Sequence, residues 1–186
     1  MTLHTPRNTE ISGICTSGFK KVYDAFETNF SERGELGSAF AVYHRGIPVV
    51  DLWGGIRDAA SGKVWQEDTL CLMMSVAKGI SAICLAMATD RGKVDLDVPV
   101  AHYWPEFAGA DKAAITVRQV MGHLAGIPVT DHAVEGDIYH PERMRRAIER
   151  QAPLWPVGTR QFYHSSTIGS IISAILEGAT GQTVGG

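Results

Sequence analysis

The chain has 186 residues, a length that fits one ordinary domain or two small packed lobes. Apolar residues make up 45% and charged residues 20%, close to the average for globular proteins, which excludes a disordered or collagen-like chain. The 17 basic and 20 acidic side chains give a net charge of -3, so no basic excess favours binding to nucleic acid or to anionic lipid.

Membrane insertion and export are not expected either. No apolar run approaches the roughly 20 residues of a membrane span. His4, Arg7 and Glu10 precede any apolar stretch, unlike the start of a signal peptide. The cysteines form neither a CxxC pair nor an even-numbered set, which indicates reduced thiols and a cytoplasmic location. They are Cys15, Cys71 and Cys84.

The first elements in chain order are a loose segment and a helix. Residues 1–16 are expected to be loosely ordered. Residues 18–33 carry apolar side chains at helical spacing, which predicts an amphipathic helix with Ser17 as its N-cap and Gly34 as its stop. These apolar residues are Phe19, Val22, Tyr23, Phe26 and Phe30.

A β-hairpin follows. Two strands are predicted over residues 38–43 and 48–53, with Gly46 supplying a positive φ in the turn between them. The first strand is apolar at nearly every position, so we expect both of its faces to be covered.

The rest of the chain predicts helices. A polar, turn-rich segment over residues 58–68 leads to an apolar run and then to a helix from Ser75 to Arg91. Thr116 and Gly126 bracket a short helix. The last two helices are expected over residues 141–151, with a face of solvated arginines, and 166–178, with an isoleucine-rich side.

Several familiar motifs are absent. Gly62 and Lys63 are followed by Val64, where a phosphate-binding loop requires a hydroxyl. The esterase elbow that starts at Gly79 ends on Ile83 instead of glycine. The histidines show no metal-ligand spacing, so we expect no metal site, and none of the motifs that are present indicates an organic cofactor.

The spacing S-x-x-K occurs twice. Ser17 and Lys20 lie on the polar side of the first helix, where a cap and a solvated lysine explain them. Ser75 and Lys78 follow five apolar residues and open a largely apolar helix. Because three residues make about one turn, both side chains share one face, and a buried amine could accept the serine proton near neutral pH. Free N–H groups at the helix start would suit an oxyanion.

A second group lies near a loop-to-helix junction. Tyr163 could present its phenol to a cleft, where a nearby ammonium would stabilise the phenolate. The alternative is a half-buried tyrosine that is hydrogen-bonded to the backbone. His164 is expected to be a wall residue.

Five segments occur in an order that resembles the serine β-lactamase and penicillin-recognising superfamily, and within it the class C-like family VIII carboxylesterases. The resemblance runs from about Gly18 to the end of the chain. The segments are Ser75–Lys78, His123–Pro128, Val157–Ser165 with its Tyr163-His164-Ser165 motif, Asp51–Gly55 and Thr116–Met121.

This resemblance implies an α+β fold in which an antiparallel sheet flanked by helices joins a mostly helical lobe. Only the N-terminal hairpin of that sheet is readable. Residues 1–60 would hold the first helix and two strands, and residues 61–186 the helical lobe. The remaining strands, which carry the family's third motif, would lie outside the sequence, and further chain, a complementing chain or strand exchange between copies would supply them.

The resemblance also implies roles. Ser75 would be the acylated nucleophile, Lys78 its proton partner and Tyr163 the second member of the base pair. Ser165 stands where the lactamase branch has asparagine, and with His164 it would contact substrate. The loss of the amide favours short or medium acyl esters over β-lactams. The alternatives are a non-catalytic binding unit and a peptidase acting on cell-wall peptides.

Overall fold

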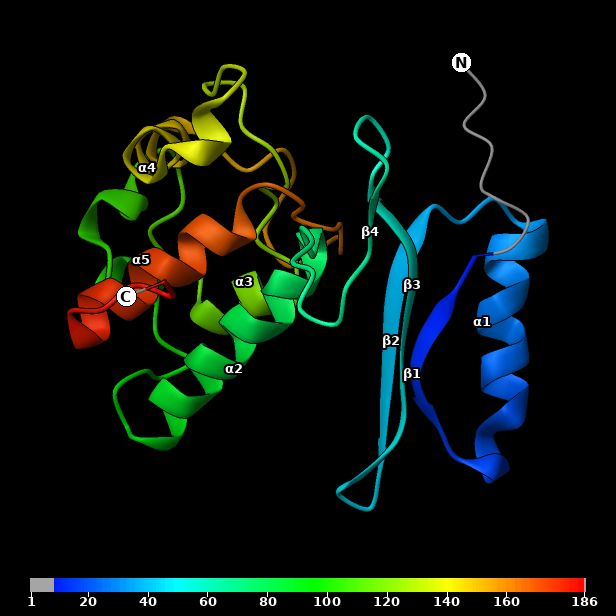
Figure 1. Ribbon diagram of the computed structural model, residues 1–186. Coiled ribbons are helices and arrows are strands. Elements are labelled where there is room, and N and C mark those ends of the chain that lie inside the picture. Colours follow the sequence, from blue (N-terminus) through cyan, green and yellow to red (C-terminus); the bar gives the residue numbers. More distant parts are fainter. Residues whose placement is uncertain (1–8, 186) are drawn as a thin grey trace. The chain divides into compact units, whose positions relative to one another are not determined.

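The computed structural model describes residues 9–185 and divides the chain into two compact units, residues 1–72 and 73–186 (Figure 1). Positions 1–8 of the expected loose segment lie outside the described residues. Each unit has its own buried apolar cluster.

The first unit contains an antiparallel sheet with the strand order β1-β3-β2, and β4 pairs with β3. The predicted hairpin is confirmed, and Arg45 (φ 52°) and Gly46 (φ 78°) both adopt the left-handed conformation in its turn. The expectation of loose structure up to residue 16 is wrong for β1, which pairs with β3. The strands are β1 (Ile11–Cys15), β2 (Gly37–His44), β3 (Ile47–Asp58) and β4 (Lys63–Val64).

Helix α1 (Lys20–Glu32) lies along this sheet (Figure 1). Phe26 and Phe30 are buried in one cluster with Val50 and Leu52 of β3, which explains the apolar spacing of the helix. The helix is confirmed, and it ends just before Gly34 (φ 74°). The expected cap is wrong: Ser17 opens a 3₁₀ turn (Ser17–Phe19) and makes no side-chain capping bond.

The expected covering of both faces of β2 is not found within the described residues. This strand is at the edge of the sheet, because β3 is the strand that pairs with both β1 and β2. Phe40 and Tyr43 of β2 are 47% and 69% exposed. An apolar edge strand of this kind has unpaired backbone groups that can accept another strand.

The second unit contains four α-helices, joined by loops and 3₁₀ turns. Thr116 caps α3 through a capping box: its side chain accepts from the Gln119 backbone, and the Gln119 side chain accepts from the Thr116 backbone. The predicted cap is therefore confirmed, although α3 is shorter than expected. The helices are α2 (Ala77–Asp90), α3 (Val117–Met121), α4 (Pro141–Arg150) and α5 (Ile168–Thr180).

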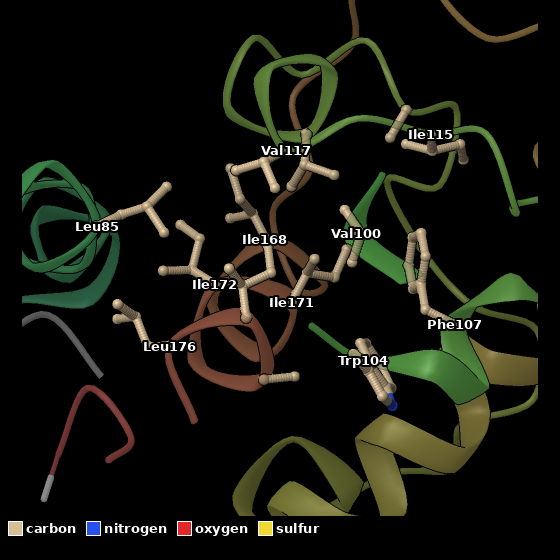
Figure 2. Packing of buried hydrophobic residues seen from close by; sticks show 14 of the residues in the cluster. Leu85, Val100, Trp104, Phe107, Ile115, Val117, Ile168, Ile171, Ile172 and Leu176 are labelled. Atoms are coloured by element: carbon tan, nitrogen blue, oxygen red, sulfur yellow. The ribbon is translucent and has the colours of Figure 1, made fainter. Parts of the chain in front are cut away.

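The core of the second unit surrounds α5. Ile168, Ile171 and Ile172 point into a cluster that also contains Leu85 of α2 and Val117 of α3 (Figure 2). The isoleucine-rich side predicted for the last helix is therefore confirmed. Burial of this side stabilises the unit, because each fully buried isoleucine contributes about 1.5–3 kcal/mol of transfer free energy.

No helix within residues 9–185 has the length and apolar character that crossing a bilayer requires.

Helix α2 is less buried than its composition predicts. Leu85 packs into the core, whereas Ile80, Ile83 and Met87 are 56%, 61% and 46% exposed. The apolar run before Ser75 is exposed as well. The expectation that Ser75 lies at a buried helix start is thus wrong for the described residues, because they bury one side of α2 and leave the other side uncovered.

Candidate active site

Ser75 and Lys78 lie at the junction between a 3₁₀ turn (Met74–Val76) and α2. The Lys78 ammonium donates to the Ser75 hydroxyl, with 3.1 Å between Nζ and Oγ. Ser75 is exposed and Lys78 half-buried. The predicted sharing of one helical face is confirmed, and the hydroxyl is open to an approaching substrate.

The turn that presents Ser75 is strained. Met74 has a φ of 46°, which non-glycine residues rarely adopt. Such a conformation costs of order 1–3 kcal/mol and is often retained where a side chain must be presented at a functional site.

The Lys78 ammonium also contacts the loop before α5. It donates to the Ser165 carbonyl at 2.9 Å and lies 4.8 Å from the centroid of the Tyr163 ring. These contacts bring Ser75 and Tyr163, which are 88 positions apart in the sequence, to the same amine. The structure therefore gathers the three residues to which the sequence analysis assigned the chemistry, while their roles remain predictions.

Tyr163 is positioned to exchange a proton with this group. Tyr163 is 49% exposed, so it is half-buried as the alternative interpretation expects, but its phenol interacts with the Ser75 and Lys78 side chains. Hydrogen bonds with Ser75 and then Lys78 lower the pKa of the Tyr163 phenol below its usual value. A phenol with a lowered pKa can exist as phenolate more readily and can accept a proton from a neighbouring hydroxyl.

The two neighbours of Tyr163 differ. Ser165 is exposed, which leaves its hydroxyl accessible. A contact between this hydroxyl and a substrate stays a prediction. His164 is fully buried: its Nε2 accepts the Ile127 N–H at 3.1 Å, and its Nδ1 lies 2.7 Å from the Phe162 carbonyl. The expectation that His164 contacts substrate is wrong, because backbone groups occupy both of its ring nitrogens.

The sequence marks His123 only as part of a motif, yet the residue lies beside the site. Its ring centroid is 5.2 Å from that of Tyr163 and 5.4 Å from that of His164, and the two imidazoles are stacked. Burial and then the positive charge of Lys78 lower the pKa of His123. Burial likewise lowers the pKa of His164.

These two histidines predict a pH dependence of stability. A histidine with a lowered pKa stays neutral in the folded chain while the unfolded chain takes up its proton at about pH 6.5. Because the unfolded state then binds more protons, the free energy of unfolding should fall as the pH drops below about 6.5 and level off below the folded-state pKa values. Urea unfolding of the wild type, His164→Asn and the exposed-site control His132→Gln measures this. The free energy of unfolding should change less steeply with pH in His164→Asn than in the wild type and in His132→Gln. An equal pH dependence in all three proteins would contradict the prediction.

The fully buried lysine of the second unit is Lys112, not Lys78. Its ammonium donates to the carbonyls of Gly109, Glu149 and Gln151 at 2.6, 2.8 and 2.7 Å. Burial lowers the pKa of Lys112 to about 8. Because three carbonyls satisfy its three donors, Lys112 joins the end of α4 to a neighbouring loop and does not face the Ser75 hydroxyl.

The two S-x-x-K pairs are also distinguished by their contacts. The Lys20 ammonium pairs with Asp24 at 2.6 Å, one turn along α1, as expected for a solvated helix face. Within the described residues, no group of three or more His, Cys, Asp and Glu side chains could hold a metal ion.

Comparison with known proteins gives the family. The family model described as Beta-lactamase matches residues 23–185. The chain belongs to this family. The Esterase/beta-lactamase LipL of Mycobacterium tuberculosis is 35% identical over 92% of the chain.

Solved structures of the family share its fold. A crystal structure of a family VIII carboxylesterase has a TM-score of 0.88 and 37% identity over 95% of the chain. A novel penicillin-binding protein homolog from Caulobacter crescentus has the same TM-score, with 36% identity over 95% of the chain. The resemblance and the β-lactamase/transpeptidase-like fold expected from the sequence are thereby confirmed.

The chain is much shorter than these relatives. It spans 40% of the length of LipL and 48% of each of the two solved chains.

Proposed function

We propose that this protein is a serine hydrolase that forms an acyl-enzyme on Ser75, with carboxylic esters as its substrates. The observation that carries the proposal is the Lys78 ammonium, which lies against both the Ser75 hydroxyl and the Tyr163 ring. A nucleophile within hydrogen-bond reach of a group that can relay its proton is the arrangement that covalent catalysis needs.

The reaction proceeds in two halves. The Ser75 oxygen attacks the ester carbonyl carbon while its proton passes to the Tyr163 and Lys78 pair. The tetrahedral adduct collapses, the alcohol leaves with that proton, and the acyl group remains on Ser75. Water then attacks the acyl carbon, gives its proton to the same pair and releases the acid, which returns Ser75 to its hydroxyl form.

Substrate choice follows from Ser165. An asparagine amide both donates and accepts through a rigid plane, whereas a serine hydroxyl is shorter and rotates. Short or medium acyl esters, which need less fixation than a β-lactam ring, are therefore the proposed substrates. The name of the family VIII carboxylesterase is consistent with ester substrates, whereas the name of LipL includes both esterase and beta-lactamase.

The test compares a p-nitrophenyl ester with nitrocefin under steady-state conditions. We expect a kcat/KM for the ester well above that for nitrocefin. A Ser165→Asn variant should narrow the difference in kcat/KM between the ester and nitrocefin. The neighbouring variant Ser166→Asn is the control and should leave that difference unchanged. Turnover of nitrocefin as fast as that of the ester, or a Ser165→Asn variant that changes neither rate, would contradict the preference.

We also propose that activity requires polypeptide that covers the apolar surfaces left exposed in the described residues. Phe40 and Tyr43 on β2 and Ile80 and Ile83 on α2 support this, because soluble chains seldom leave so many large apolar side chains uncovered. Further chain or a second copy would supply the cover. Light scattering and ester hydrolysis measured on this chain test it: a cooperatively folding 20.1 kDa monomer that hydrolyses esters would contradict the proposal. The cytoplasmic location expected from the sequence stays a prediction.

A further inference from the structure

His123 contacts the chain on both sides of Tyr163. Its carbonyl accepts the N–H of Phe162 at 3.1 Å, and its Nδ1 accepts the N–H of His164 at 3.1 Å. The residues immediately before and after the tyrosine are therefore held by one and the same residue.

The protonation state of His123 suits this contact. Because Nδ1 accepts a hydrogen bond, the neutral ring carries its proton on Nε2. Burial and the neighbouring Lys78 charge lower the pKa of His123, which keeps the ring neutral and its Nδ1 available as an acceptor. A protonated ring would lose that acceptor and the hydrogen bond with it.

The backbone of His123 is in a conformation that non-glycine residues adopt uncommonly. Its φ is 58°, in the left-handed region, where glycine and asparagine are better tolerated. The strain is of order 1–3 kcal/mol, so stability of the turn alone does not call for histidine at this position. The contacts of the side chain are the feature that a glycine could not reproduce.

The segment that His123 holds is also fixed by hydrogen bonds to Ile127. The buried His164 ring bonds to Ile127 and Phe162, as described above, and the Thr167 hydroxyl donates to the Ile127 carbonyl at 2.6 Å. The main chain around Tyr163 is thus attached to the segment 123–127 at several points, while the phenol itself remains half-exposed. Among these contacts, His123 contributes a ring whose centroid lies 5.2 Å from that of Tyr163.

We infer that His123 is a positioning residue: by holding the main chain on both sides of Tyr163, it places the phenol against Ser75 and Lys78. Its kinetic consequence rests on the proposed function, whereas its structural consequence, the placement of the phenol, does not. Misplacement of a reacting group by about 1 Å can cost on the order of 100-fold in rate.

Three substitutions separate the functions of the His123 ring. In His123→Asn, the amide oxygen can take the place of Nδ1, and asparagine tolerates the left-handed backbone. In His123→Gln, the side chain reaches the position of Nε2 but offers no acceptor at the position of Nδ1. His123→Gly has neither and relieves the backbone strain, so it should fold.

The first measurement is ultraviolet titration of tyrosine in the full chain. The chain has five tyrosines, and ionisation of Tyr163 should appear as a step below the usual pH range of a phenol, which Tyr163→Phe should remove. His123→Asn should keep the step. His123→Gln and His123→Gly should move the step up towards the usual pH range of a phenol, because the phenol no longer lies against Lys78.

The second measurement is the rate at which a fluorophosphonate labels Ser75. We expect His123→Asn to stay near the wild-type rate and both His123→Gln and His123→Gly to be about 100-fold slower. Thermal unfolding of each variant checks that the fold is retained. Equal titrations in all variants would overturn the inference. So would normal behaviour in His123→Gln with loss in His123→Asn, because the ring would then act through Nε2. Failure of the wild type to be labelled, with the titrations as expected, would refute the proposed function and leave the positioning role intact.

Discussion

Replacement of Ser75 by alanine should abolish the hydrolysis of a short p-nitrophenyl ester, with a loss on the order of 10⁴ to 10⁶ in kcat. The hydroxyl that forms the acyl bond is removed, and with it the aliphatic hydroxyl to which the Lys78 ammonium donates. Ser75 is exposed at the start of α2, so the substitution deletes little packing and the fold should be retained.

Ser17→Ala is the matched control for this variant. Ser17 has the same spacing to a lysine, but that lysine is paired with Asp24, and the serine makes no side-chain capping bond. Its replacement should leave both activity and stability close to those of the wild type. Circular dichroism and steady-state kinetics on both variants measure this. Loss of activity in Ser17→Ala with retention in Ser75→Ala would show that the assignment of the nucleophile is wrong.

Lys78→Ala and Tyr163→Phe should each slow acylation by about 10² to 10⁴, the range expected when a group that transfers a proton is removed. Combined in one chain, they should cost little more than the more severe single variant. The reason is that both groups serve one proton transfer, so the second substitution removes a function that the first has already disabled.

Single-turnover labelling of Ser75 in the wild type, both single variants and the double variant measures the interaction. The exposed residues Lys93 and Tyr139 provide controls, and Lys93→Ala and Tyr139→Phe should label at the wild-type rate. Losses in log rate that simply add in the double variant would indicate separate structural roles. An unchanged rate in Tyr163→Phe would show that the phenol takes no part in the reaction.

Local structure was predictable wherever short-range spacing determines it. The hairpin follows from a turn with Gly46 between two β-rich runs, and α5 follows from isoleucines at helical spacing. The capping box of α3 is readable from Thr116 and Gln119 alone. Strand β1 was missed because five residues that include two glycine or serine positions form a strand only when they pair with β3.

The burial of individual side chains was less predictable, because it depends on which other segments pack against each face of an element. Both Lys78 and Lys112 are lysines near apolar residues in the sequence, yet only Lys112 is fully enclosed. Three carbonyls that arrive from residues 109, 149 and 151 enclose it, and no local pattern reveals their convergence. His164 shows the same limit, since its buried contacts come from a segment almost forty positions away.

The sequence by itself determined the family, the hairpin and the main helices, and the identity of Ser75, Lys78 and Tyr163 as the candidate site, because motif spacing and helical periodicity are local properties of the chain. Only the tertiary structure decided that the Lys78 amine contacts both Ser75 and Tyr163. It also decided that His164 is buried and hydrogen-bonded to the backbone, and that His123 holds the main chain on both sides of Tyr163. Those contacts join segments far apart in sequence. They exist because packing around α5 brings the loop before it onto the start of α2 and the end of α3. Contacts between segments so far apart in the sequence cannot be predicted from any single position.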